Sequence, residues 1–309
     1  MHTAMSGMVR MALVALLCAG AQSVSADELE GQPAALLRAR YEALRDRLSD
    51  SPFGKPLYLE SREIADSVSG DIFALVDYPF PAAEAALNGP APWCDILILH
   101  PNTKYCRVST AGPGSILDVG IGRKTGQPPD KAYRLDFAYR VVAAAPGYLK
   151  VRLDADTGPL GTRNYRVIFE AIPLESGRTF LHLTYSYAYG LAGRLALQTY
   201  LETIGSGKVG FTVVGTGSDG RPRHVGGLRG VVERNSMRYY LAVEAFLGAL
   251  SAPPPAQLEK RLEDWFDAVE RYPLQLHEME RSDYLEMKRR EISRQQAGFG
   301  VTTEVALHE

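Results

Sequence analysis

The stretch that decides the fold is Thr179-Phe-Leu-His-Leu-Thr-Tyr-Ser-Tyr-Ala-Tyr189, in which residue types alternate with a period of two. Successive side chains of a strand point to opposite faces. One face would carry Leu181, Leu183, Tyr185, Tyr187 and Tyr189, and the other Phe180, His182, Thr184, Ser186 and Ala188. A buried tyrosine provides an apolar ring and a hydroxyl that needs a partner. We therefore expect a strand whose tyrosine-bearing face is the inner surface of a core.

The same period extends upstream and predicts seven further strands between residues 57 and 174. These are Leu57–Ile64, Asp71–Tyr78, Cys106–Thr110, Ile116–Arg123, Tyr133–Ala144, Tyr148–Asp156 and Tyr165–Leu174. Turn residues at Ser69-Gly70, Pro146-Gly147 and Ser176-Gly177 would join neighbouring strands. Connections this short permit only antiparallel pairing. The sequence thus predicts one antiparallel meander, interrupted by a short helix around Pro81–Leu87.

Helical spacing of apolar residues flanks the meander on both sides. An amphipathic helix is expected at residues 33–48. Helices are also expected at Leu191–Thr203, Leu228–Leu250, Gln257–Arg271 and Leu274–Gln295. The last of these is heavily charged, and we expect it to lie on the surface. Residues 297–309 are expected to form a flexible tail.

The order of these elements resembles the START-like (helix-grip, SRPBCC) superfamily. The local likeness is Tyr78-Pro-Phe-Pro-Ala-Ala-Glu-Ala-Ala-Leu87 followed by Trp93, where a proline-marked helix leaves the early strands. The resemblance covers residues 57–250 and implies an α+β fold in which a curved antiparallel sheet grips a long helix. Residues 27–56 would then be an N-terminal helical segment and residues 251–296 a C-terminal helical extension.

The resemblance also implies a cavity between the sheet and its helix, suited to an apolar ligand such as a lipid or sterol. Ligand pockets are mostly apolar with a few polar groups. The residues expected to face this space are Leu183, Tyr185, Tyr187, Tyr189, Phe137, Tyr139, Tyr165 and Phe169. The alternative interpretation is that these side chains form an ordinary core.

Two other functions stay open. One is a cyclase- or hydrolase-like enzyme in the same cavity, although no residue is singled out as catalytic. The other is a non-enzymatic assembly factor that docks through residues 257–295. Gly215-Thr-Gly-Ser-Asp-Gly220 satisfies a dinucleotide motif, but Arg221-Pro222 follows where a helix is required. No GxSxG or HExxH occurs, and we expect neither cofactor nor metal.

The first 26 residues have the features of a cleavable secretory signal. Arg10 precedes the apolar run Met11–Ala19, and Val24-Ser-Ala26 supplies a cleavage site after Ala26. The apolar run is far short of the ~20 residues that span a bilayer. We therefore expect a periplasmic or secreted protein.

Cysteine usage and charge are compatible with export. Cleavage would leave Cys94 and Cys106, which are expected to form a disulfide, as two cysteines in an oxidising compartment usually do. A metal site with His100 and a reactive thiol are the alternatives. The net charge of −2 provides no general attraction to phosphate backbones, so nucleic acid is not an expected partner. A lipid ligand would allow a transient membrane contact.

Overall fold

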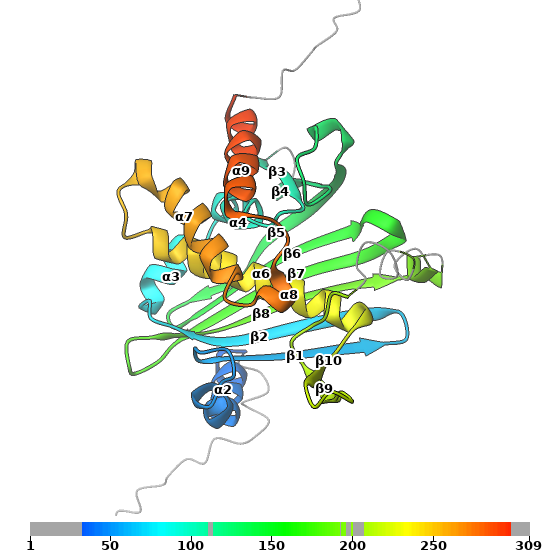
Figure 1. Cartoon of the computed structure of the whole chain (residues 1–309). Coiled ribbons are helices and arrows are strands. Elements are labelled where there is room, and N and C mark those ends of the chain that lie inside the picture. Colours follow the sequence, from blue (N-terminus) through cyan, green and yellow to red (C-terminus); the bar gives the residue numbers. More distant parts are fainter. Residues whose placement is uncertain (1–32, 111–113, 192, 196–198, 200–206, 298–309) are drawn as a thin grey trace, which may run out of the picture.

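The structure is a computed structural model that describes residues 33–110, 114–191, 193–195, 199 and 207–297 (Figure 1). Its centre is an antiparallel sheet of eight strands in the order β1-β2-β8-β7-β6-β5-β4-β3. The strands are β1 (Leu57–Ile64), β2 (Ser67–Val76), β3 (Thr103–Ser109), β4 (Ser115–Ile121), β5 (Tyr133–Ala145), β6 (Tyr148–Thr157), β7 (Thr162–Pro173) and β8 (Thr179–Tyr189). From β3 the chain meanders strand by strand until β8 pairs with β2. The predicted antiparallel meander is confirmed.

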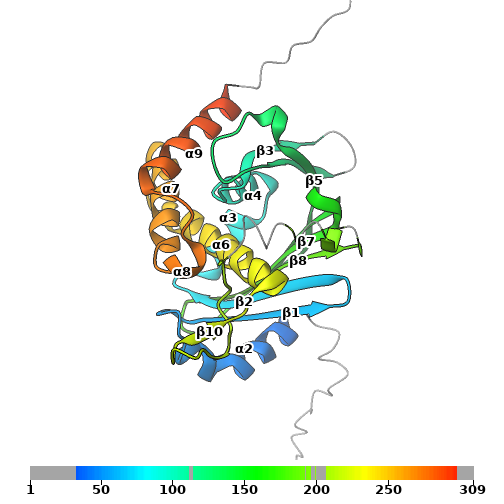
Figure 2. The ribbon, with the colours of Figure 1, turned by 45° about the vertical axis from the view of Figure 1, so that its right-hand side comes forward.

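One face of the sheet is covered by the long helix α6 (Gly227–Ala249) and by the helix pair α3 (Phe80–Leu87) and α4 (Pro90–Leu97). Figure 2 shows these helices on the side of the sheet opposite α2. α6 packs against β1, β2 and β8, and its apolar residues share one hydrophobic core with the inner face of the sheet. This arrangement of a sheet around one long helix is the expected α+β helix-grip architecture.

The close contact between α6 and the sheet explains why the turn predicted at Ser69-Gly70 is wrong. β1 ends at Ile64 and β2 begins at Ser67, so Gly70 lies inside β2, paired with Ser61. A Cβ at Gly70 would lie 2.5 Å from Oγ of Ser236 on α6, and the Ser236 hydroxyl donates to the Gly70 carbonyl at 3.1 Å. The glycine allows the helix backbone to approach the sheet.

The opposite face is covered by α2 (Pro33–Ser49), which confirms the predicted amphipathic helix. α2 buries Leu37, Leu44 and Leu48 against Phe73 and Phe180 in a second, smaller apolar cluster. Tyr41 of α2 packs its ring 5.1 Å from that of Phe180. The sheet is therefore covered on both faces near Phe180, which explains why this residue is fully buried on the face of β8 that also carries His182, Thr184 and Ser186.

The C-terminal part folds as α7 (Pro254–Val269), α8 (Pro273–Leu276) and α9 (Arg281–Gln296). The single helix predicted at Leu274–Gln295 is wrong, because His277 is extended (φ −58°, ψ 129°) and ends α8. α9 lies at the surface as predicted, with Glu286, Arg289 and Arg290 exposed, but its other face is buried. Its buried residues are Tyr284, Leu285, Met287, Lys288, Glu291 and Ile292. Trp265 of α7 stacks on Tyr284 at 4.9 Å, which joins both helices to the main core.

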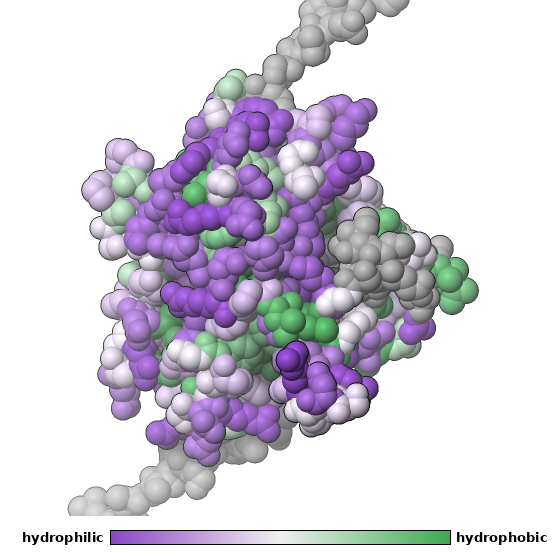
Figure 3. All heavy atoms as spheres, viewed as in Figure 1, coloured by the Kyte–Doolittle hydropathy of each residue, from purple (hydrophilic) through white to green (hydrophobic). Residues whose placement is uncertain are grey.

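Short elements complete the described chain. Two 3₁₀ turns lie at Pro129–Lys131 and Pro159–Gly161, and the segment around Gly215–Gly220 forms a hairpin of β9 (Val213–Thr216) and β10 (Pro222–His224). The predicted signal at residues 1–26, most of the predicted helix Leu191–Thr203 and nearly all of the predicted tail fall outside the described residues. Among the helices of the described ranges, none has the length and apolarity to cross a membrane. The face shown in Figure 3 is mainly hydrophilic, with scattered apolar patches.

Candidate ligand pocket

A pocket of about 160 Å³ lies between the inner face of the sheet and α6. Four of the eight residues expected to face a cavity line it. They are Phe137, Tyr165, Tyr185 and Tyr187. The strand register explains why the tyrosines meet. Val167 of β7 pairs with Tyr185 of β8. Tyr165 lies two residues before Val167, and Tyr187 two residues after Tyr185, so all three rings lie on the same face of the sheet.

The tyrosine rings form a contiguous aromatic wall. Tyr165 stacks on Tyr187 with ring centroids 5.3 Å apart, and Tyr185 lies 5.2 Å from Tyr239 of α6. The Tyr165 hydroxyl is 2.8 Å from Oγ1 of Thr162. Burial raises the pKa of Tyr165 to about 12 and that of Tyr185 well above its usual range. These phenols therefore stay protonated and can donate hydrogen bonds.

α6 contributes residues at a spacing of four. Val231, Asn235 and Tyr239 all line the pocket, because residues four apart share one face of a helix. Asn235 is the polar member of this row. Its side chain is also a hydrogen-bond partner of Tyr185, which opposes the rise in that pKa.

His100 is the second polar residue at this end of the pocket. The backbone N–H of Asn102 donates a hydrogen bond to His100 Nδ1 at 3.1 Å. Nδ1 is therefore an acceptor, and the network assigns the ring proton to Nε2, which lies 3.4 Å from Asn235 Oδ1. Burial, with the nearby cations Arg238 and Lys288, lowers the pKa of His100 well below its usual value. His100 is thus a neutral imidazole with a donor group toward Asn235.

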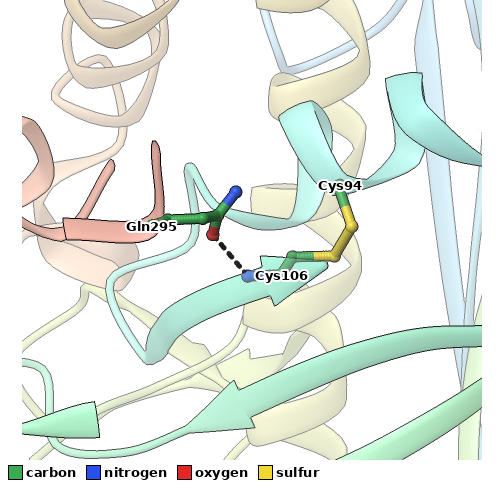
Figure 4. The surroundings of a disulfide bond; sticks show 3 residues. All are labelled: Cys94, Cys106 and Gln295. Carbon is green, nitrogen blue, oxygen red and sulfur yellow. Dashed lines mark hydrogen bonds between the residues drawn. A yellow bond between two sulfur atoms is a disulfide. The ribbon is translucent and has the colours of Figure 1, made fainter. Parts of the chain in front are cut away.

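The predicted disulfide between Cys94 and Cys106 is present, with the Cα atoms 5.1 Å apart. It joins α4 to β3, and Figure 4 shows Gln295 of α9 accepting the Cys106 backbone N–H at 2.8 Å. The loop that it closes contains three residues of the pocket, Leu97, His100 and Asn102. The disulfide replaces the metal-site and free-thiol interpretations of these cysteines. Over the ranges that the structure describes, no group of His, Cys, Asp or Glu is arranged to hold a metal ion.

The other four predicted residues are buried but do not line the pocket. Phe169 packs edge-on against Trp93 at 5.8 Å, and Leu183 belongs to the solid core. Tyr139 buries its hydroxyl with no hydrogen-bond partner among the described residues. Tyr189 lies at the end of β8, where its hydroxyl donates to Glu63 at 3.2 Å.

Sequence reasoning did not find Asn235 and Tyr239, and it considered His100 only as a metal ligand. The spacing of Val231, Asn235 and Tyr239 on a predicted helix was the available signal for α6. No sequence pattern places His100 against Asn235, because they are 135 residues apart and meet through the packing of α4 on α6.

The outer face of the sheet carries a separate polar cluster beside α2. His182 lies between Asp71 (Nε2–Oδ1 2.9 Å) and Glu170 (Nδ1–Oε2 3.1 Å), and its ring stacks on Phe73 at 4.2 Å. Burial lowers the pKa of His182, but the hydrogen bonds that its ring donates to these two carboxylates outweigh burial and raise the pKa. Hydrogen bonds from His182 and Tyr148 lower the pKa of Glu170 to about 2, again against burial. A cleft of about 680 Å³ adjoins this cluster and α2.

No family model and no curated protein sequence matches this chain. Among solved structures, a norcoclaurine synthase point mutant from Thalictrum flavum is 15% identical, with a TM-score of 0.33 over 44% of this chain and 86% of that one. An aromatase/cyclase, Zhui from Streptomyces sp. R1128, is 13% identical, with a TM-score of 0.30 over 69% and 96%. Ara h 8.0201 is 11% identical, with a TM-score of 0.28 over 48% and 91%. Because these TM-scores are low, the assignment of the fold rests on the strand order and helix packing described above.

Proposed function

We propose that this protein binds a small apolar molecule, about one ring in size, in the pocket between the sheet and α6. The observation that carries the proposal is the meeting of an aromatic wall with two polar residues, His100 and Asn235, at one end. Apolar walls with a few convergent polar groups characterise ligand sites. The polar group of the ligand would lie at His100 and Asn235, and its ring among Tyr165, Tyr185 and Tyr187.

The volume favours a ligand smaller than a whole lipid or sterol. Pockets for drug-sized ligands enclose about 300–1,000 Å³, whereas an apolar cavity of about 150 Å³ binds benzene. The 160 Å³ here matches the smaller class. A sterol or acyl chain would have to insert one end and extend past Leu160, which lines the pocket and is half exposed.

The tautomer of His100 favours binding over proton abstraction. A general base needs an accessible lone pair. The one lone pair of this neutral imidazole already accepts the Asn102 N–H. His100 therefore supplies a donor to a bound ligand, which supports a carrier or binding role rather than the cyclase- or hydrolase-like alternative.

The proposal includes export to the periplasm or outside the cell. The buried disulfide between Cys94 and Cys106 supports this location, because disulfides persist in oxidising compartments. The assembly-factor alternative would have to use the exposed face of α9, because the face that carries Tyr284, Lys288 and Glu291 is buried in the core.

A pocket-filling variant tests the proposal. Val231→Phe places a larger side chain in the pocket, and Val142→Phe makes the same change at a site that is 53% exposed. Calorimetric titration with phenol, toluene and cyclohexanol should show binding to the wild type and to Val142→Phe, and a loss of at least ten-fold in affinity for Val231→Phe. Equal binding by both variants, or no binding of any ring compound, would refute the proposal.

A further inference from the structure

The segment that carries His100 is held from behind by α9. The Tyr284 hydroxyl donates to the Leu99 carbonyl at 2.8 Å. The Lys288 ammonium donates to the carbonyls of His100 at 2.8 Å and Thr103 at 2.7 Å. α9 thus binds three carbonyl groups of the loop that the disulfide closes.

Lys288 belongs to a buried cluster of three charged groups. Lys104 and Lys288 each donate to Glu291 at 2.9 Å, and all three side chains are 0% exposed. Lys104 also donates to the carbonyls of Pro101 and Thr125. Two ammonium groups therefore share one carboxylate. Burial lowers the pKa of Lys288 to about 8, so the cluster carries one net positive charge below that pH.

We propose that this buried cluster favours the ionised form of an acidic ligand, such as a phenol or a carboxylic acid, whose oxygen binds at His100. The inference rests on the proposed function and names the ligand class of the same site. The cluster reaches the site through the His100 carbonyl, which Lys288 contacts directly.

Two features of the site connect the charge to this preference. A charge in a buried environment acts over a longer range than in water, because the effective dielectric constant is lower. Arg238 of α6, which is paired with Glu278 at 2.6 Å, and Lys288 both disfavour protonation of His100. The bond from Asn102 to Nδ1 leaves the ring proton on Nε2. An anionic oxygen bound at Nε2, which now faces Asn235 Oδ1 across 3.4 Å, would accept this proton and be attracted by the charge of Lys288. A neutral ligand would gain the hydrogen bond alone.

The test uses 4-nitrophenol, whose protonated and ionised forms differ in visible absorbance. The apparent pKa of the bound probe is measured by titrating absorbance with protein in excess, and is compared with that of the free probe. Burial raises the pKa of a phenol in this pocket, as it does for Tyr165 and Tyr185, so the effect of the cluster is measured as the difference in bound pKa between variants. Lys288→Met should raise the bound pKa by about one unit, the size of effect that a nearby opposite charge exerts. Lys131→Met, at a side chain that is 74% exposed, should leave it unchanged.

The variants are chosen so that charge can be removed without leaving an unpaired carboxylate. Lys288→Met retains the Lys104–Glu291 pair, and Lys104→Met retains the Lys288–Glu291 pair. If one variant fails to fold, the other provides the same measurement. A bound pKa that Lys288→Met does not change, or a probe that fails to bind although phenol or toluene binds, overturns this inference and leaves the proposed function intact. No binding of any ring compound overturns both.

Discussion

Replacing Glu170 with glutamine should destabilise the protein most strongly in mildly acidic solution. The Glu170 carboxylate accepts hydrogen bonds from His182 and from the Tyr148 hydroxyl, and it lies 3.2 Å from the Lys150 ammonium. Its side chain is 15% exposed. A pKa near 2 in place of 4.5 corresponds to about 3 kcal/mol of stabilisation at about 1.4 kcal/mol per unit.

The pH dependence of the stability follows from the pKa shifts of Glu170 and His182. The pKa of Glu170 is lowered, so its contribution is fully present above about 4.5 and is lost as pH falls toward 2. The pKa of His182 is raised, so its contribution is present below about 6.5 and is lost as pH rises through the folded-state value. The stability difference between wild type and Glu170→Gln should therefore be largest between about pH 4.5 and 6.5.

Urea unfolding followed by circular dichroism, at several pH values from about 2.5 to 8, measures this difference. Glu175→Gln, at an exposed position near the end of β7, is the matched control and should show little difference at any pH. A difference for Glu170→Gln that stays constant between about pH 5 and 2.5 would show that the carboxylate is not stabilised by these contacts.

Three further outcomes are expected. Replacing both Cys94 and Cys106 by alanine should cost roughly 3 kcal/mol in thermal unfolding, and it should weaken ring-compound binding because the loop holds His100; an unchanged affinity would show that α9 alone positions the loop. Gly70→Ala should cost about 1–3 kcal/mol through its clash with Ser236, and adding Ser236→Ala should recover most of this loss; a purely additive double variant would argue against the contact. When the protein is expressed with residues 1–26 in a bacterial host, its mature form should begin at Asp27 by intact-mass measurement, and retention of residues 1–26 would contradict the predicted signal.

The antiparallel pairing of neighbouring strands could be predicted because alternation and short connections are local properties of the sequence. The pairing of β2 with β8 could not, because it joins segments about 110 residues apart. The strand at Thr179–Tyr189 was predicted to the residue. The turn at Ser69-Gly70 was misplaced because glycine usually marks a turn, whereas here it provides space for α6. The sequence pattern does not distinguish a glycine that a turn requires from a glycine that leaves room for a helix packed against the strand.

The sequence predicted which face of the sheet the pocket would lie on, but not where on that face it would lie. Alternation placed Tyr185, Tyr187, Leu183 and Tyr189 on one side of β8, but it does not reveal where the core is left unfilled. Leu183 and Tyr189 pack at positions where neighbouring elements fill the space, and Tyr185 and Tyr187 lie where the smaller Val231 and Asn235 face them. That difference depends on how α6 crosses the sheet.

The charged character of α9 was misleading for a physical reason that bears on function. Lys288 and Glu291 suggest a solvated face, because lysine and glutamate are almost never fully buried unless paired. Here they are buried because each has a charged partner and because Lys288 also donates to two carbonyls of the His100 loop. Stability alone is a weak reason for a buried ion cluster, since well-packed apolar residues are often as stabilising. A cluster that contacts the backbone of the pocket's polar residue therefore has a more specific explanation, in which burial of charge sets the electrostatic potential at the ligand site.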